Sequence, residues 1–143
     1  MISESDTRYL VEATVPLRLA CVTSSGWPIV ASLWYVYQDG KLYCATRKSA
    51  KILRHIESGQ KCAFEVSNNE PPYRGVRGRG IVTLRQGRGA DMLRLLLSRY
   101  LRSVDSPFAK RLLANSQDEI VIELEPERTY SWDFTKRMRG ISD

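Results

Sequence analysis

Residues 42–51 read LYCATRKSAK, and the periodicity of the chain changes within this stretch. Lys41 to Thr46 alternates as a half-buried strand does, whereas Ile52, Leu53 and Ile56 recur at helical spacing beyond Ser49. A glycine at position 59 is a suitable stop for a short helix. The stretch therefore predicts a strand that ends, and a helix that begins, among hydroxyl and cationic side chains.

Such a junction suits the binding of a phosphate group. The first N–H groups of a helix have no intrahelical partner and lie at the positive end of its dipole. Ser49 and Lys51 would add direct contacts to a phosphate. The alternative is that Ser49 only caps the helix while the cations face water. The residues alone leave both interpretations open.

Strand patterns precede the junction. Leu17–Val22 alternates apolar and other residues, and residues 24–28 are typical of a turn. Ile29–Tyr37 is rich in β-branched and aromatic residues, and the pair Asp39-Gly40 favours a tight turn before Lys41. The first third of the chain is therefore predicted to be a three-stranded meander, with a short helix at Arg8–Ala13 before it.

Further strands and two helices follow the junction. The predicted strands are Lys61–Val66, Tyr73–Arg85 and Glu119–Glu125, the predicted helices are Met92–Leu101 and Ser106–Leu113, and an extended tail covers Thr129–Phe134. Glycines 75, 78 and 80 within one strand indicate bending or close backbone approach. Several antiparallel strands with few helices predict a mainly β, α+β barrel whose open side the helices fill. Residues 1–143 fit one domain.

The amino-acid composition indicates which kinds of partner the protein binds and in which cellular compartment it is found. The 22 Lys and Arg against 16 Asp and Glu give a net charge of +6, which favours a negatively charged partner such as nucleic acid or phosphate. Cys21, Cys44 and Cys62 lie in apolar strand-like runs and are predicted to be buried thiols, and His55 is the only histidine, so no metal site is expected. No apolar segment approaches the roughly 20 residues of a membrane span, and the polar start differs from a signal peptide. A cytoplasmic protein without membrane contact is expected.

The order of elements from Leu17 to Leu84 resembles the FMN-binding split barrel of the pyridoxamine 5'-phosphate oxidase-like superfamily. The resemblance rests on a first strand, a small turn, an aromatic second strand, a tight turn, a third strand, and then a Ser-x-Lys element. It extends over two further strands: residues 26–28, Asp39-Gly40, residues 42–46, Ser49-x-Lys51, Cys62–Val66 and residues 76–80 carry it. It implies an antiparallel split β-barrel that forms a homodimer.

The resemblance also implies a phosphate site. In that superfamily the end of the third strand and the Ser-x-Lys segment hold the phosphate of FMN or of the deazaflavin F420. Transferred to this sequence, Thr46, Ser49 and Lys51 become phosphate ligands, with Arg47 and Lys48 as additional contacts.

Three more residues are placed near the cofactor by the resemblance. Trp34 would lie beside the ring, although a tryptophan in a barrel wall is equally ordinary core filling. Arg79, with Arg77 on the same strand face, would border the cofactor groove across the dimer or else face solvent. Trp132, in the aromatic tail, would close the site of the partner chain.

Three functions are compatible with these residues. The leading hypothesis is an FMN-dependent oxidoreductase with a small-molecule redox substrate, because such a protein needs no catalytic triad. An F420-dependent reductase is the first alternative, with a basic groove formed by Arg77, Arg79, Arg85 and Arg88. A nucleic-acid-binding module is the second, since residues 73–80 resemble an RGG segment. The alternation around Val76 places that segment in a sheet, which disfavours this alternative. The leucine-rich helix 92–101 is expected to serve the core alone.

Overall fold

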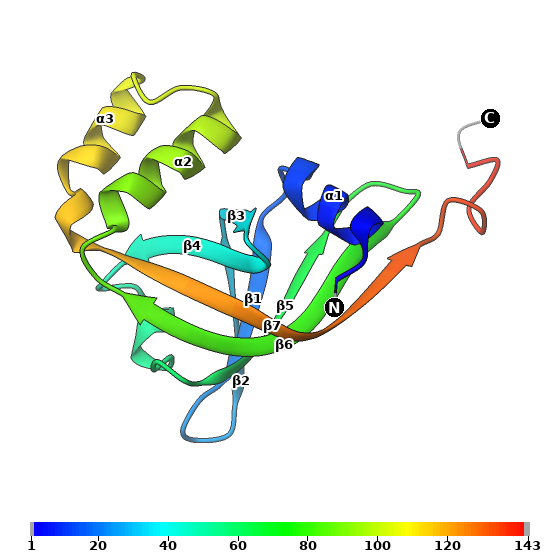
Figure 1. The fold of residues 1–143 in the computed structure, drawn as a ribbon, viewed down its shortest axis with the longest axis horizontal. Coiled ribbons are helices and arrows are strands. Elements are labelled where there is room, and N and C mark those ends of the chain that lie inside the picture. The colour runs from blue at the N-terminus through cyan, green and yellow to red at the C-terminus, as the bar shows by residue number, and fades with distance from the viewer. Residues whose placement is uncertain (1, 142–143) are drawn as a thin grey trace.

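A computed structural model describes residues 2–141 as one curled antiparallel sheet with three α-helices (Figure 1). The sheet order is β2-β1-β5-β6-β7-β4-β3. The strands are β1 (Leu17–Val22), β2 (Pro28–Leu33), β3 (Tyr35–Gln38), β4 (Lys41–Arg47), β5 (Lys61–Ser67), β6 (Arg74–Arg85) and β7 (Glu119–Asp133). The helices are α1 (Glu4–Glu12), α2 (Gly89–Leu101) and α3 (Pro107–Ala114), with 3-10 turns η1 (Lys51–Arg54) and η2 (Ser116–Asp118). The predicted split β-barrel architecture is confirmed.

The two edges of the sheet are consecutive in the chain. β2 is one edge and β3 is the other, and Trp34 alone separates them. The hairpins β1–β2 and β3–β4 are present as predicted, but the three-stranded meander and the single strand Ile29–Tyr37 were wrong. A continuous run of β-branched and aromatic residues suits one strand or two, and here long-range pairing of β1 with β5 and of β4 with β7 determines the result. The split of the barrel therefore lies at Trp34.

The interior of the barrel forms the main hydrophobic core. It includes Leu19, Tyr35, Phe64 and Ile122, each at most 3% exposed. All three cysteines are buried free thiols, as predicted, and burial raises the pKa of Cys62 to about 11 and that of Cys44 to about 12. These thiols are therefore protonated, and they serve as small apolar side chains.

β6 and β7 form a long twisted pair that extends the sheet beyond the barrel (Figure 1). The predicted tail Thr129–Phe134 is the continuation of β7, so the strand predicted for Glu119–Glu125 runs on to Asp133. A register shift lies between Arg79 and Gly80, where a Cβ on Gly80 would collide with the Glu125 carbonyl. The predicted close backbone approach at these glycines is confirmed.

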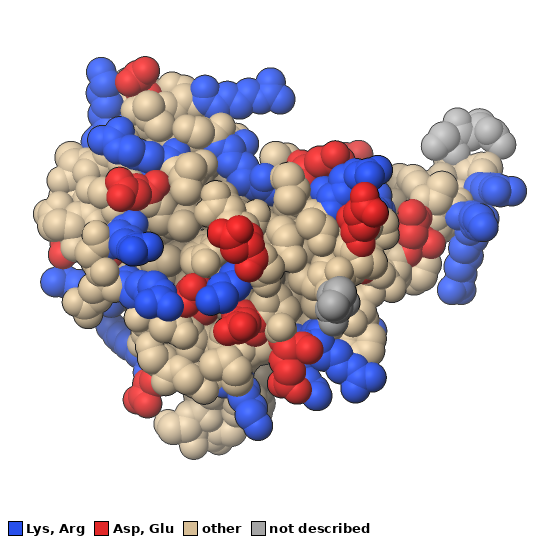
Figure 2. All heavy atoms as spheres, viewed as in Figure 1, with Lys and Arg blue, Asp and Glu red and all other residues tan. Residues whose placement is uncertain are grey.

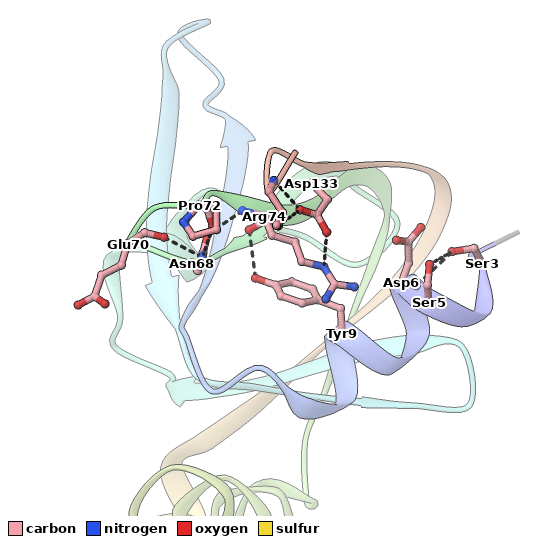
Figure 3. A network of polar contacts seen from close by, with 10 residues as sticks. Ser3, Ser5, Asp6, Tyr9, Asn68, Glu70, Pro72, Arg74 and Asp133 are labelled. Atoms are coloured by element: carbon pink, nitrogen blue, oxygen red, sulfur yellow. Dashed lines mark hydrogen bonds and ion pairs between the residues drawn. The ribbon is translucent and has the colours of Figure 1, made fainter. Parts of the chain in front are cut away.

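α1 begins earlier than predicted, at Glu4, because Ser3 accepts the Asp6 N–H and caps the helix. Figure 3 shows how the helix is attached: the Tyr9 hydroxyl donates to the Arg74 carbonyl, and the Arg74 guanidinium lies 4.8 Å from the Tyr9 ring centroid. Arg74 also reaches Asp133 at 4.0 Å. This network joins the N-terminal helix to β6 and to the end of β7.

α2 and α3 pack at the opposite end of the molecule from the C-terminal end of β7 (Figure 1). Leu93 and Leu97 of α2 meet Ala109 of α3 in a second, smaller core, with Trp34 against it. No helix within residues 2–141 is long and apolar enough to cross a membrane. On the face shown in Figure 2, acidic side chains lie among the basic ones over the sheet, so no continuous basic stripe crosses it.

Candidate functional site

A pocket of about 410 Å³ opens at the split of the barrel. We call it the seam pocket. One side is the end of β2 and Trp34, the other is the end of β4, and α2, α3 and the first residue of β7 complete it. Its lining residues are Ser32, Leu33, Trp34, Ala45, Thr46, Arg47, Ser49, Ala50, Leu93, Leu96, Leu112 and Glu119. Hydroxyl and guanidinium groups thus share one pocket with an apolar wall.

Four of the eight predicted site residues meet in this pocket: Trp34, Thr46, Arg47 and Ser49. Trp34 is held by Tyr100 of α2, whose ring stacks on it at 5.0 Å and 7°. The Tyr100 hydroxyl donates to the Val15 carbonyl at 3.0 Å and accepts the Tyr35 N–H at 3.2 Å. These hydrogen bonds fix the Tyr100 ring, and the stacked Tyr100 ring in turn fixes the orientation of Trp34.

The prediction of an α-helix after Ser49 was wrong. The structure has only the four-residue 3-10 turn η1, whose N-cap is Ala50 with no side-chain cap bond. Ile52 and Ile56 are both buried, so one turn and a bend satisfy the apolar spacing that suggested a helix. The helix-dipole argument and the Ser49 cap both fail, and any anion here must be held by side chains and by backbone of the loop.

The two lysines of the segment are not among the residues that line the pocket. Lys48 pairs with Asp118 of η2 at 3.3 Å, and both side chains are largely exposed. Lys51 is exposed at the start of η1 and is not among the lining residues. The exposed Lys51 side chain is free to turn toward a ligand, whereas Lys48 first has to leave its ion pair with Asp118.

Arg79 and Trp132 lie outside the seam pocket. Arg79 pairs with Glu127 at 3.4 Å and lines a separate groove of about 470 Å³ on the outer face of the sheet. We call this the outer groove: Arg18, Ala20, Val30, Ala63, Phe64, Glu65, Arg77, Gly78, Arg79 and Tyr130. Trp132 packs on Gly75 beneath Arg77, and twelve residues of β7 lie between it and Glu119, about 40 Å along the strand. Within one chain it does not reach the seam pocket.

The basic groove predicted from four arginines is divided. Arg77 and Arg79 line the outer groove, whereas Arg85 and Arg88 line a third cleft beside the β3–β4 hairpin. Arg85 there is bound to Glu123 through two hydrogen bonds of 2.9 and 2.7 Å. Sequence spacing alone did not show this division, because the strand is twelve residues long and curved.

Several lining residues were missed by the sequence analysis. Leu93 and Leu96 of the helix that was assigned only to the core also form the wall of the seam pocket. Glu119 was expected to begin a strand with only Ile120, Ile122 and Leu124 inward. Residues 121–124 are all buried, because α2 packs near the other face of β7. The alternation predicted a strand with one covered face, so the local pattern gave no signal for the burial of Glu119.

Glu119 is an unusual member of this wall. The residue is 7% exposed, and within residues 2–141 its carboxylate has no hydrogen bond or ion pair; its oxygens are not fully buried, and the residue lines the pocket. Burial raises its pKa, which the Arg47 charge opposes only in part. A Cβ on Gly89 would lie 2.5 Å from the Glu119 Cβ, so the glycine permits α2 to approach this residue.

Comparison with known proteins identifies the family. The sequence profile described as pyridoxamine 5'-phosphate oxidase matches residues 4–133, nearly the whole chain. The chain belongs to this family. No curated protein matches the sequence. Among residues 2–141 no group of His, Cys, Asp and Glu is suited to hold a metal ion.

Solved structures share the fold of this family member at low sequence identity. An F420 reductase is 22% identical with a TM-score of 0.74, covering 90% of this chain and 98% of its own. A conserved hypothetical protein from Mycobacterium tuberculosis is 18% identical with a TM-score of 0.76, covering 96% and 88%. An FAD-binding protein from Mesorhizobium loti is 19% identical with a TM-score of 0.64, covering 91% and 94%.

Proposed function

We propose that the chain is an FMN-binding oxidoreductase that holds the cofactor phosphate in the seam pocket. The observation that supports this best is the meeting of Thr46, Arg47 and Ser49 with an apolar wall at the split of the barrel. Guanidinium and hydroxyl groups are strong partners for phosphate oxygens. The apolar wall suits a planar ring, and the pocket volume lies in the range of cofactor sites.

The chain's own residues bind and orient in this proposal. Arg47, Thr46 and Ser49 would hold the phosphate. Lys51, exposed at the start of η1, would turn toward the same phosphate and add a charge-assisted contact. Leu33 and Trp34 would lie along the ring. The flavin, when bound, supplies electron transfer with a small-molecule redox substrate. Tyr100 keeps Trp34 in place through the stacking contact. Three buried free thiols also suit the reducing cytoplasm that we propose as its location.

We further propose a homodimer that uses the outer face of the sheet. Val30 and Tyr130 border the outer groove and are 67% and 50% exposed, which is unfavourable for apolar and aromatic side chains without a partner. A second copy would cover this face and would bring Arg79 and Trp132 to a pocket that they do not reach in their own chain. Light scattering at micromolar concentration tests the dimer, and a monomer would contradict it.

The experiment for the cofactor compares FMN with riboflavin, which lacks the phosphate. Lys51→Ala is expected to weaken FMN binding about ten- to a hundredfold, because a charge-assisted contact contributes about 1.5–3 kcal/mol. Riboflavin binding should change little. Lys61→Ala, an exposed lysine at the start of β5, is the control and should bind FMN as the wild type does. Equal losses for both ligands, or no loss of FMN affinity, would contradict the phosphate assignment.

F420 is a second candidate. The outer groove holds Arg18, Arg77 and Arg79 in one place, a suitable surface for a polyacidic tail, and one structural neighbour is an F420 reductase. Competition between FMN and F420 for the purified protein separates the two candidates. Displacement of FMN by F420 at equal concentration would favour the second one. A charge reversal at Arg77 should then weaken F420 and leave FMN unchanged.

A further inference from the structure

Glu119 places a carboxyl group in a pocket that otherwise suits an anion. It opens β7 directly opposite Arg47 in the β4–β7 ladder, and both residues line the seam pocket with Thr46 and Ser49. α2 meets β7 here at one end of the sheet (Figure 1). A phosphate bound by Arg47 therefore lies in the same pocket as this carboxyl group.

The groups around Glu119 do not neutralise it fully. β4 presents Arg47, whose charge favours the ionised form of Glu119, and η2 presents Asp118, whose charge opposes it. Asp118 is itself paired with Lys48. α2 contributes Gly89, which has no side chain, and α3 contributes the apolar Leu112. Arg88 and Asp91 line the third cleft instead.

A phosphate bound by Arg47 would lie near the Glu119 carboxylate, because the two residues are opposite one another in the ladder and line the same pocket. Two anions repel one another, and the repulsion is stronger in a partly buried pocket than in bulk water. Protonation of the carboxyl group removes the repulsion, and the resulting O–H becomes a hydrogen-bond donor for an oxygen of the ligand. The proton comes from solvent and returns to solvent when the ligand leaves.

We propose that Glu119 takes up one proton when a phosphate ester binds in the seam pocket, so that it couples cofactor affinity to pH. This inference rests on the proposed function, since it requires the phosphate in that pocket. Glu119 is then a specificity-determining residue, because a ligand without an anionic group needs no proton. FMN should bind more tightly as the pH falls, and riboflavin should not.

The test measures the dissociation constants of FMN and riboflavin between pH 5 and pH 8. Glu119→Gln carries a neutral side chain of the same shape and mimics the protonated acid. Both proteins should bind FMN within about twofold at pH 5, and Glu119→Gln should bind it about tenfold more tightly at pH 8. Ionisation of the FMN phosphate near pH 6 is common to both proteins and cancels in their ratio. Glu125→Gln, an exposed carboxylate on the same strand, is the matched control and should behave as wild type.

Proton uptake gives an independent measurement on the unaltered protein. Titration calorimetry of FMN in two buffers of different ionisation enthalpy should show more uptake at pH 7.5 for the wild type than for Glu119→Gln. Riboflavin should show none in the wild type, which keeps the test valid if the variant does not fold.

A pH-independent ratio of the two FMN constants, or zero uptake by the wild type, overturns the role of Glu119 and leaves the cofactor assignment standing. No FMN binding by the wild type at any pH overturns the proposed function, and this inference with it. A change in the ratio that is equal for riboflavin also overturns it, because a general loss of packing would affect both ligands.

Discussion

Two glutamates of β7 lie four residues apart with nearly equal burial and opposite surroundings. Glu123 is 6% exposed, and its carboxylate accepts hydrogen bonds from Arg85, from Lys41 and from the Tyr43 hydroxyl. Glu119 is 7% exposed, and its carboxylate has no such partner within the described residues. Burial acts to raise the pKa of both, but at Glu123 the bonds from Arg85 and Lys41 prevail and lower it.

The difference distinguishes a carboxylate with a structural role from one that is available to a ligand. A buried charge with its full set of partners stabilises local structure, and Glu123 joins β4, β6 and β7 in this way. A carboxylate that opens into a pocket and has no protein partner is available to a ligand instead, and Glu119 of the seam pocket is of this kind. The seam pocket contains the second kind, and the third cleft contains the first.

Removal of Glu123 should have the largest effect on stability. Glu123→Ala leaves Arg85 and Lys41 without their carboxylate and should lower the free energy of unfolding at pH 7 by about 2 kcal/mol. The loss is smaller than for a wholly buried pair, because the Arg85 side chain is 48% exposed. Urea denaturation measures it. An unchanged midpoint would show that the two carboxylates differ less than their contacts indicate.

The pH dependence of that loss is the second prediction. A lowered pKa means that Glu123 contributes stability above its ordinary value of 4.5, and this contribution is lost as the pH falls through the lower pKa of the folded state. The gap between wild type and Glu123→Ala should therefore be full at pH 7 and should narrow below about pH 4.5. Denaturation curves at several pH values measure it, and a gap that widens in acid would contradict the sign.

Glu119→Gln should have the smallest effect, with the opposite sign. A raised pKa means that the native state binds more protons than the unfolded state, so wild-type stability falls as the pH rises above the ordinary value of 4.5. The Glu119→Gln variant has no ionisable group at this position, so its stability does not fall in this way as the pH rises. It should match the wild type near pH 4 and exceed it at pH 8 by about 1 kcal/mol or less. A variant less stable than wild type at pH 8 would indicate a hidden partner for Glu119.

Local patterns predicted most of the strands but not the way in which they close. The alternation of Leu17–Val22 and the turn at Asp39-Gly40 are local signals, and both hairpins formed as expected. The break at Trp34 depends on pairings with β5 and β7, which are distant in the sequence. The same reason hid Glu119, since its burial comes from α2 and from the end of β4.

The candidate site was predicted in part for a related reason. Thr46, Arg47 and Ser49 meet because they follow one another at the end of a strand, which sequence shows directly. The helix expected after Ser49 did not form, because apolar spacing over five residues is too short to distinguish a helix from a 3-10 turn and a bend. Arg79 and Trp132 do not line the pocket within one chain, because the long curved pair β6–β7 carries them away from it.

The most direct test of the central claim is a crystal structure of the protein grown with FMN. We expect the phosphate in the seam pocket, within hydrogen-bonding distance of Arg47 and of the Thr46 or Ser49 hydroxyl, with the ring beside Trp34. A phosphate bound by Arg18 and Arg77 in the outer groove, with the seam pocket filled only by water, would contradict it.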